Sequence, residues 1–321
     1  MLKVLRQGAP GFDEPTIIAS AAWILPADAV WIELISPTRP EELAVEQALG
    51  VLLPTREEMA EIETSSRLYQ EDGATYMTAT ILAHADDELP VSAPVTFVLV
   101  NQRLVTIRYL EPKAFTLFSG QAERQPSLCP NGVTTFLGLI DAIIDRLADI
   151  LERTGAEVEA NSREIFRQPR TGGFEAILTR LGRAQNINAK VRDSLVSMAR
   201  LISFAMLADQ IEKDQEARDH LRSLQRDVTS LTDHDSYLSS NITFLLDAAL
   251  GLINIEQNAI IKIFSIGAVC LMPPTLVASI YGMNFKHMPE LNWVGGYPWA
   301  LGLMIIAGVL PLWWFRKKHW L

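Results

Sequence analysis

Two long apolar segments near the carboxyl-terminal end dominate the pattern of hydrophobic and polar positions. Residues 263–280 and 297–315 contain no charged side chain. A helix needs about 20 apolar residues to cross a hydrocarbon layer of roughly 30 Å. A buried core helix would explain one such run, but two in tandem favour a membrane. We therefore predict membrane-spanning helices at 259–281 and 297–315, joined by an external loop at 282–296.

The first 132 residues predict a mixed α/β domain. Four runs rich in β-branched residues are typical of strands. These runs are 31–35, 75–82, 95–100 and 104–109. The last two lie three residues apart and predict a hairpin. Thr38 with Glu41, and Thr55 with Glu58, have the spacing of capping boxes and predict two helix starts.

The following residues predict long helices. Residues 133–213 favour a helical hairpin that turns at 170–173 and returns over about 174–207. No proline lies between Pro169 and Pro273, so one helix can run from about residue 214 to 281. At 1.5 Å per residue it would be about 100 Å long. Its first part, 214–258, would form a stalk and its last part the first membrane span.

The stalk and first span share a face of small and polar residues, which we call the seam. Alternate steps of four and three residues along a helix define the face that meets neighbouring helices. The seam residues are Asp247, Gly251, Asn254, Asn258, Ile261, Ser265, Ala268, Met272, Thr275 and Ser279. A ring of such helices could enclose a hydrated path. Alternatively, small residues permit close helix packing.

Charge distribution predicts the topology and excludes one class of partner. The net charge of −10 argues against nucleic acid binding. The basic residues Arg316, Lys317 and Lys318 follow the second span, so both termini are expected in the cytoplasm, with 316–321 as a basic tail. With Lys262, they would form an electrostatic collar or interfacial anchors. The polar amino terminus has no signal-peptide pattern, and Cys129 and Cys270 are not expected to pair.

The polar content of the spans limits the transport mechanisms. No Asp, Glu or His lies within 260–280 or 297–315, whereas proton-coupled carriers usually need such a group. The chain has no Gly-Lys dipeptide and therefore no phosphate-binding loop of the ATPase type. Passive flow remains, and a divalent cation gains about 4.6 kcal/mol per 100 mV. We expect no catalytic residues and no bound cofactor.

A motif at the end of the first span gives a family resemblance. The segment 273–285, which contains Gly282-Met283-Asn284, strongly resembles the CorA family of magnesium channels. The segments 254–258, 288–291 and 317–321 are similar as well. The resemblance implies a homopentamer in a bacterial inner membrane, with an α/β/α cytoplasmic funnel. It implies transport of Mg²⁺, with Co²⁺ and Ni²⁺ as further candidates, and closure by cytoplasmic Mg²⁺.

The resemblance also implies roles for individual residues. Gly282, Met283 and Asn284 would form the outer selectivity filter, with Glu290 in the same external loop. The seam would line the pore, with Asp247 as an acidic ring and Ile261 and Phe264 at an apolar constriction. Mg²⁺ gives up its water reluctantly, so neutral amide oxygens of Asn284 suit its hydrated form. Asn284 alone could also be a helix cap after Gly282.

The regulatory metal sites are less sharply indicated. Carboxylates suit hard divalent ions, and the family closes when Mg²⁺ binds acids between protomers. The candidates are Asp86, Asp87 and Glu88 on one protomer and Asp219 or Asp227 on its neighbour. An acidic run such as 86–88 is also typical of a solvated loop.

Three other functions compete with a magnesium channel. A zinc transporter resembling ZntB would use the same scaffold, although Met283 keeps the magnesium-type motif. A membrane-tethered sensor would use the spans only as anchors, and the polar seam argues against it. A membrane-bound enzyme has little support, because no nucleophile–base motif, His-Glu-x-x-His or Cys-x-x-Cys occurs.

Overall fold

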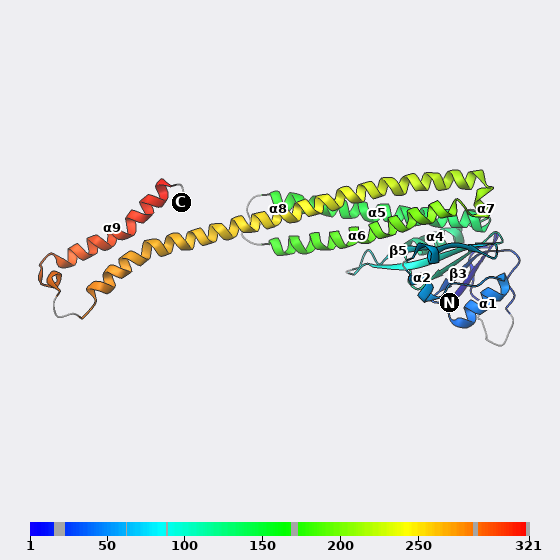
Figure 1. Cartoon of the computed structure of the whole chain (residues 1–321), viewed down its shortest axis with the longest axis horizontal. Helices are drawn as coiled ribbons and strands as arrows, with labels where there is room; N and C mark the ends of the chain where they lie inside the picture. Colours follow the sequence, from blue (N-terminus) through cyan, green and yellow to red (C-terminus); the bar gives the residue numbers. More distant parts are fainter. Residues whose placement is uncertain (16–22, 62, 88, 168–172, 285–287, 319–321) are drawn as a thin grey trace. The chain divides into compact units, whose positions relative to one another are not determined.

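The computed structural model describes residues 1–15, 23–61, 63–87, 89–167, 173–284 and 288–318 (Figure 1). The chain divides into two compact units. The first unit contains Met1–Arg167 and Ala176–Leu245, and the second contains Gln168–Glu175 and Leu246–Leu321.

The first unit contains a seven-stranded sheet with the order β2-β1-β3-β7-β6-β5-β4. The strands are β1 (Leu2–Arg6), β2 (Phe12–Asp13), β3 (Ala29–Ile35), β4 (Leu68–Glu71), β5 (Ala74–Ala83), β6 (Val91–Val100) and β7 (Arg103–Arg108). Only β3 and β7 pair in parallel among these neighbours. All four predicted strands are confirmed.

The predicted hairpin is β6–β7, but its loop has two residues instead of three. Asn101 and Gln102 both have positive φ, 48° and 61°. Such a two-residue turn matches the twist of antiparallel strands and favours Asn at its first position. The strand therefore begins one residue earlier, at Arg103, than its apolar pattern indicates.

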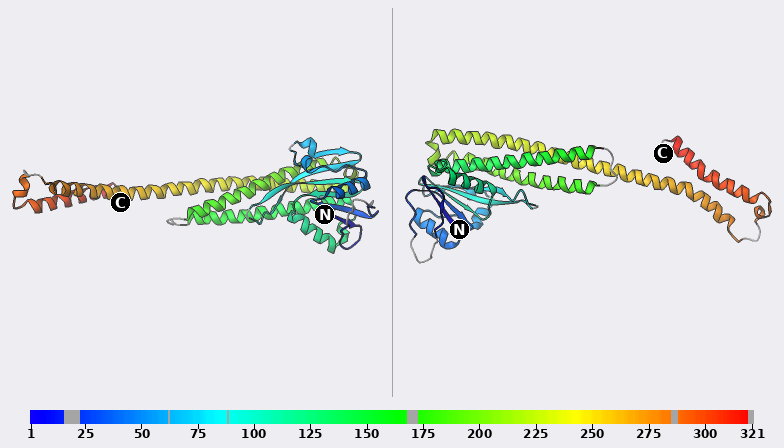
Figure 2. Two further views of the ribbon diagram at one scale, coloured as in Figure 1. Left: turned by 90° about the horizontal axis from the view of Figure 1, so that it is seen from below. Right: turned by 180° about the vertical axis from the view of Figure 1, so that it is seen from behind.

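Helices cover both faces of the sheet, which confirms the α/β/α arrangement (Figures 1 and 2). On one face, α1 (Arg39–Leu49) and α2 (Arg56–Ala60) join a core with β3 and β7. On the other face, Phe118 of α4 (Lys113–Arg124) packs on Trp31, and Phe136 packs on Phe97. Because side chains alternate along a strand, Trp31 and Ile32 of β3 pack against the helices on opposite faces of the sheet.

The predicted capping boxes are present at both helix starts. The amide of Thr55 donates to Glu58 at 2.7 Å, and the amide of Glu58 donates back to the Thr55 hydroxyl at 3.3 Å. The amide of Thr38 donates to Glu41 at 2.8 Å. Among the described residues, this unit also contains two short helices and one 3-10 turn: α3 (Thr64–Arg67), η1 (Pro126–Leu128) and α7 (Asp209–Glu212), the last of which directly precedes α8.

Three long helices lie side by side in the first unit (Figures 1 and 2). The expected helical hairpin consists of α5 (Gly132–Phe166) and α6 (Phe174–Ala205). The third helix is α8 (Gln215–Tyr281), a continuous helix of 67 residues, as predicted. Contacts of α5 with α8 run from Asp141–His220 to Phe166–Phe244, so these two helices are parallel.

The first residue of α5 lies against the β6–β7 hairpin. The Gly132 amide donates to the Gln102 carbonyl at 2.6 Å. A Cβ atom at Gly132 would lie 2.4 Å from the carbonyl carbon of Arg103. Since this neighbour is backbone, a side chain at residue 132 requires the helix or the hairpin to move.

We therefore expect Gly132→Ala to destabilise the chain by about 2 kcal/mol or more, the usual cost of overpacking. The matched control is Gly155→Ala, because no atom lies within 4 Å of a Cβ there. Within the same helix, that change should stabilise by about 0.5–1 kcal/mol. Thermal unfolding of both variants tests the pair, and equal midpoints would contradict this account of Gly132.

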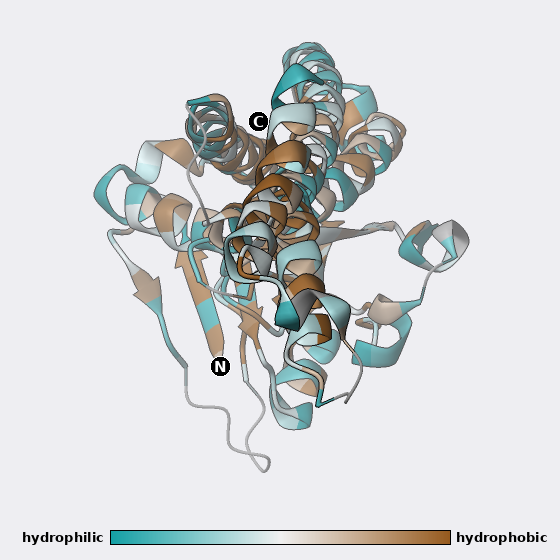
Figure 3. Ribbon diagram, turned by 90° about the vertical axis from the view of Figure 1, so that its left-hand side faces the viewer, coloured by the Kyte–Doolittle hydropathy of each residue, from teal (hydrophilic) through white to brown (hydrophobic). Residues whose placement is uncertain are grey.

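The second unit contains the last part of α8, the 3-10 turn η2 (Pro289–Asn292) and α9 (Gly296–Lys317). Within the described residues, α8 and α9 are the two helices long and apolar enough to cross a membrane. Only 11% of each apolar window is buried, which is unlike the core helix of a soluble protein. The apolar character of these helices is also visible in Figure 3.

Candidate functional site

The seam lies on an uncovered face of α8. All ten seam residues are exposed: Asp247, Gly251, Asn254, Asn258, Ile261, Ser265, Ala268, Met272, Thr275 and Ser279. Phe264, at the edge of the seam, is 75% exposed. A face of this length, exposed along about nine helical turns, has no partner within the described chain.

The opposite face of α8 is the packed one. In the first unit, residues at heptad spacing are buried, among them Leu238, Ile242 and Leu245. The same spacing continues to Ile266 and Cys270, which form a small core with Phe315 of α9. At 100° per residue, this face lies roughly opposite to the seam. The helix therefore turns one face to its own chain and leaves the other for different partners.

A close approach between α8 and α9 fixes this arrangement in the second unit. A Cβ atom at Gly308 of α9 would lie 3.3 Å from Cγ of Pro274 and 3.4 Å from the carbonyl oxygen of Cys270. A small residue thus permits contact with the proline pair, Pro273 and Pro274, inside α8.

The part of the seam nearest the Gly-Met-Asn motif is hollowed into an open groove of about 460 Å³. Four seam residues, Ala268, Met272, Thr275 and Ser279, line it together with Leu271 and Leu276. The Thr275 hydroxyl donates to the Leu271 carbonyl at 2.8 Å. Pro273 and Pro274 remove the helix donors of the carbonyls four residues earlier, at Val269 and Cys270, so this hydroxyl bond is an additional one on the Leu271 carbonyl.

The Gly-Met-Asn motif directly follows the seam. The Gly282 amide donates to the Ala278 carbonyl at 2.9 Å, and the Met283 amide donates to Ile280 at 3.2 Å. A Cβ at Gly282 would lie 3.1 Å from the Ala278 oxygen, so a side chain there requires a shift of a few tenths of an ångström. Gly282 does not have the left-handed backbone of a helix-ending glycine cap. Met283 and Asn284 are exposed beyond it.

The structure describes only part of the segment that follows the motif. Residues 285–287 lie outside the described residues, so the predicted external loop is described at 282–284 and again from Met288 onward. Glu290 belongs to η2 in that loop.

The basic tail begins within the last turn of α9. Arg316 and Lys317 are in the helix, and Lys318 is its cap. The Lys317 ammonium lies 5.4 Å from the centre of the Trp313 ring. Lys262 of α8 directly precedes the uncharged run 263–280.

Tryptophans mark both ends of the second predicted span, a signal that the sequence reasoning missed. Trp293 and Trp299 are 58% and 56% exposed near its start, with ring centroids 6.5 Å apart. Trp313 and Trp314 are 62% and 52% exposed near its end. Amphipathic rings at this separation are typical of the two membrane–water interfaces.

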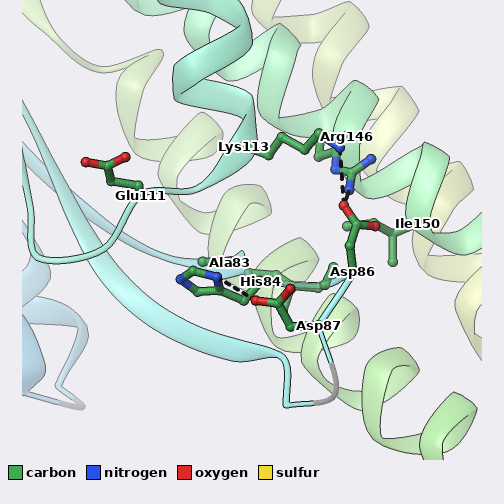
Figure 4. A pocket seen from close by; sticks show the side chains of 10 residues that line it. Ala83, His84, Asp86, Asp87, Glu111, Lys113, Arg146 and Ile150 are labelled. Atoms are coloured by element: carbon green, nitrogen blue, oxygen red, sulfur yellow. Dashed lines mark hydrogen bonds and ion pairs between the residues drawn. The ribbon is translucent and has the colours of Figure 1, made fainter.

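Asp86, a predicted regulatory ligand, is held by three cations, of which Lys113 and Arg146 are labelled in Figure 4. Its carboxylate lies 3.2 Å from Lys113, 2.7 Å from Arg146 and 2.5 Å from Arg153. Burial raises the pKa of Asp86, but the hydrogen bonds from Arg153 and Lys113 outweigh burial and lower the pKa to about 2. In this arrangement, the negative charge of the Asp86 carboxylate is neutralised by cations of the same chain.

Of the other two residues of that acidic run, Asp87 and Glu88, the structure describes only Asp87. Asp87 pairs with His84 at 2.9 Å, and both line a small pocket of about 140 Å³ with Asp86 (Figure 4). Glu88 lies outside the described residues.

The stalk acids differ in their surroundings. Asp219 pairs with Arg222 at 2.7 Å, and hydrogen bonds from Gln215 and Arg222 lower its pKa. Asp227 instead lies near an acidic row on α5. Burial, followed by the charges of Asp141, Asp149 and Asp227, raises the pKa of Asp145.

The acidic row Asp141, Asp145 and Asp149 was not predicted as a site. Its spacing of four residues places it on one helix face, and this spacing was the available signal. Within the part of the chain that the structure describes, no group of three or more His, Cys, Asp or Glu side chains is arranged to hold a metal ion.

Comparisons with known proteins agree with this architecture. A family model described as "CorA-like Mg2+ transporter protein" matches residues 26–317. The magnesium transport protein CorA of Yersinia pseudotuberculosis is 37% identical over 295 residues, which cover 92% of this chain and 93% of that protein.

Solved structures show the same fold. The complete CorA magnesium transporter from Methanocaldococcus jannaschii matches with a TM-score of 0.76 at 16% identity, over 100% of this chain and 99% of that chain. The cytoplasmic domain of ZntB from Vibrio parahaemolyticus matches with a TM-score of 0.54 at 12% identity, over 78% of this chain and 97% of that chain.

Proposed function

This chain belongs to the CorA family of Mg²⁺ transporters, and we propose that it conducts Mg²⁺ passively across a membrane through a homo-oligomeric pore. The chain is an ion transporter and not an enzyme. The observation that carries the proposal is the seam: a polar face of α8, exposed from Asp247 to Ser279 and ending at Gly-Met-Asn.

The two faces of α8 support assembly from copies of the same chain. The face opposite to the seam is occupied by α9, through Ile266, Cys270 and Phe315. Seam residues can then meet only other molecules, and closed rings are the common form of symmetric assembly. Five copies, as the family resemblance implies, would place α8 around a central axis and α9 outside.

The proposed entrance suits a hydrated Mg²⁺ ion. Dehydration of Mg²⁺ is costly, so a ring of acceptors that binds its water shell lowers the barrier to entry. Asn284 supplies neutral amide oxygens and is exposed beyond the end of α8. Neutral ligands bind weakly enough to release the ion. Gly282 and Met283 complete the proposed filter.

Below the entrance, the seam would line the pore. Asn258, Met272 and Thr275 are proposed pore-facing residues, and Asp247 is a proposed acidic ring. Ile261 and Phe264, which are 61% and 75% exposed, would form the apolar constriction. Hydrophobic constrictions gate by excluding water.

Topology and driving force follow from charge. The basic residues Arg316, Lys317 and Lys318 favour cytoplasmic termini in a bacterial inner membrane. Together with Lys262 they would anchor the inner interface or form a collar. An inside-negative potential would drive uptake, since a divalent ion gains about 4.6 kcal/mol per 100 mV.

Ion selectivity tests the proposal against its nearest alternative. The likeness to the ZntB cytoplasmic domain shows that the fold alone does not distinguish zinc from magnesium transport. Met283 favours magnesium. Vesicles containing the purified chain should take up Mg²⁺, and by family resemblance Co²⁺ and Ni²⁺. Uptake of Zn²⁺ with no uptake of Mg²⁺ would favour the zinc transporter.

Closure by cytoplasmic Mg²⁺ is proposed to involve the stalk acids. Asp227 and Asp145 lie close enough for their charges to interact, and a divalent cation would relieve their repulsion. Asp219 is a weaker candidate because Arg222 already pairs with it. Asp86 and Asp87 would have to leave their present ion pairs to bind a metal.

We expect Asp227→Asn to raise the internal Mg²⁺ concentration that halves the flux by about threefold or more, because one hard carboxylate ligand is lost. Asp233→Asn is the control, since Asp233 is an exposed acid on the same helix. Flux into vesicles loaded with graded Mg²⁺ measures both. If the two variants responded alike, Asp227 would have no regulatory role.

A further inference from the structure

A buried carboxyl group without a hydrogen-bond partner lies in the middle of the helical part of the first unit. Asp235 of α8 is 0% exposed, and neither of its side-chain oxygens has a hydrogen-bond partner. The Arg192 guanidinium of α6 is 3.9 Å away, beyond hydrogen-bond distance. Leaving a buried carboxylate in this state is costly.

Asp235 occupies a position that the helix normally fills with apolar side chains. Steps of seven, three and four residues along the packed face of α8 join Val228, Asp235, Leu238 and Ile242, and all four are buried. A polar group at such a position reduces stability and fixes how helices pair. Its placement is therefore not that of an ordinary surface acid.

The neighbouring side chains of α6 supply acceptors where donors are needed. Asn188 donates its amide hydrogen to the backbone carbonyl of Asp235 at 3.2 Å, and its own Oδ1 is buried without a partner. One turn away, Gln185 donates to the Ser239 hydroxyl at 3.3 Å, and its Oε1 is also without a partner. Apart from the Ser194 hydroxyl, the buried side-chain atoms of α6 and α8 that lack a hydrogen-bond partner among the described residues are all acceptors.

Other buried acids in the first unit are satisfied differently. Glu33 is paired with Arg108 at 2.8 Å. Glu46 accepts a hydrogen bond from the Leu53 amide at 3.1 Å. The fold provides a donor for each of these carboxylates, whereas Asp235 lacks one unless it carries a proton itself.

The charges around Asp235 do not stabilise its ionised carboxylate enough to offset its burial. Among the described residues, Arg192 and Asp193 of α6 and His234 of α8 act on it. The buried side chains of α5 are all uncharged. Burial, the largest influence, raises the pKa of Asp235 to about 6, although Arg192 and His234 oppose the rise.

We propose that Asp235 is a proton-binding site that controls how tightly α8 packs against α6. The protonated carboxyl donates to a buried acceptor of the α6 layer, such as Oδ1 of Asn188, and the layer is then satisfied. The deprotonated carboxyl draws in water or Arg192 and loosens the layer. Since α8 also carries the seam, acidification on the stalk side alters ion flux; this consequence rests on the proposed function.

The sign of the pH effect follows from the raised pKa. An acid whose pKa is raised in the folded state keeps a proton that the unfolded chain has already lost. As the pH rises from the unfolded-state pKa to the folded-state pKa, the free energy of unfolding therefore falls. The penalty is thus complete above a pH of about 6. Packing at Asp235 is weakest near neutral pH and strengthens on acidification.

The test compares the full chain with its Asp235→Asn and Asp233→Asn variants at about pH 5 and about pH 7.5. Asparagine keeps the shape of the side chain and supplies a neutral donor. We expect Asp235→Asn to raise the unfolding temperature by several degrees at the higher pH and to change it little at the lower. The exposed Asp233 should show no such pattern.

Infrared spectroscopy reads the proton directly. The wild-type chain should show a protonated-carboxyl band that titrates with a midpoint of about 6 and is missing from the Asn variant. An Asn variant that unfolds earlier, fails to fold, or leaves the band unchanged would overturn the proposal. Stabilisation of only the wild-type chain by added Mg²⁺ or K⁺ near pH 7.5 would overturn it in favour of a cation site.

These measurements need no ion transport, so they separate the proton site from the proposed function. Flux tests the coupling between the two. Mg²⁺ flux by the wild-type chain should change between about pH 5 and pH 7.5 on the stalk side, and Asp235→Asn should flatten the change. An unaltered pH profile in the variant would overturn the regulatory consequence.

Discussion

Asn284→Ala is expected to lower Mg²⁺ flux into vesicles at least about tenfold and to weaken discrimination among divalent ions. Each amide oxygen that binds the water shell contributes about 1 kcal/mol, and a ring loses one in every copy. A loss of about 1.4 kcal/mol at the entrance barrier already gives the tenfold change. The side chain is exposed beyond the end of α8, so its removal should not disturb the fold.

Asn292→Ala is the matched control for this change. Asn292 is an exposed asparagine at the end of η2, in the same loop between α8 and α9. Its removal should leave flux within about twofold of the wild type. Flux through Asn284→Ala equal to that of the control, with unaltered selectivity, would refute the filter assignment.

Ala268→Trp is expected to block flux almost completely, by about a hundredfold or more. Ala268 lies on the seam and lines the open groove below the Gly-Met-Asn motif. In a ring of copies, each indole would add a large apolar group to the axis, where a hydrated ion has to pass. The measurement is Mg²⁺ entry into vesicles with equal amounts of incorporated protein.

The control for the seam is Ile306→Trp. Ile306 is 60% exposed on α9, and tryptophan is readily accommodated on a surface that faces lipid. This variant should conduct like the wild type. If both tryptophan variants conducted normally, the seam would not line the path. If both failed equally, the loss would report general damage to the spans.

The long helix and the two apolar helices were predictable because their signals are local. Apolar runs, missing prolines and a three-and-four spacing all act within one helix, and α8 from Gln215 to Tyr281 follows them closely. The exposure of the seam could be inferred as well, since small and polar residues repeat along one face. The partner of the opposite face could be identified only from the structure. There, Phe315 of α9 packs against Ile266 and Cys270.

Less of the α/β domain was predictable. Strand β1 escaped notice because Lys3 and Arg6 interrupt its three buried residues, Leu2, Val4 and Leu5. The helix α4 has no capping box, and it is held by Phe115 and Phe118 against the sheet. Tertiary packing decides such elements, and local propensity does not.

The acidic residues show the same limit. The sequence predicted Asp86 as a metal ligand in an exposed acidic run. In the structure, its carboxylate forms ion pairs with Arg146 and Arg153 of α5, which lie far along the chain. Asp235 was not singled out from the sequence, although its place in the repeat with Val228 and Leu238 was visible. Contacts between distant segments set the role of each carboxylate.

The most direct test of the central claim is Mg²⁺ entry into vesicles that contain only the purified chain and a Mg²⁺-sensitive dye. With ATP absent and pH equal on both sides, influx should begin when an inside-negative potential is imposed and should grow with that potential. No entry above protein-free vesicles, or entry only with ATP or a proton gradient, would contradict a passive Mg²⁺ channel.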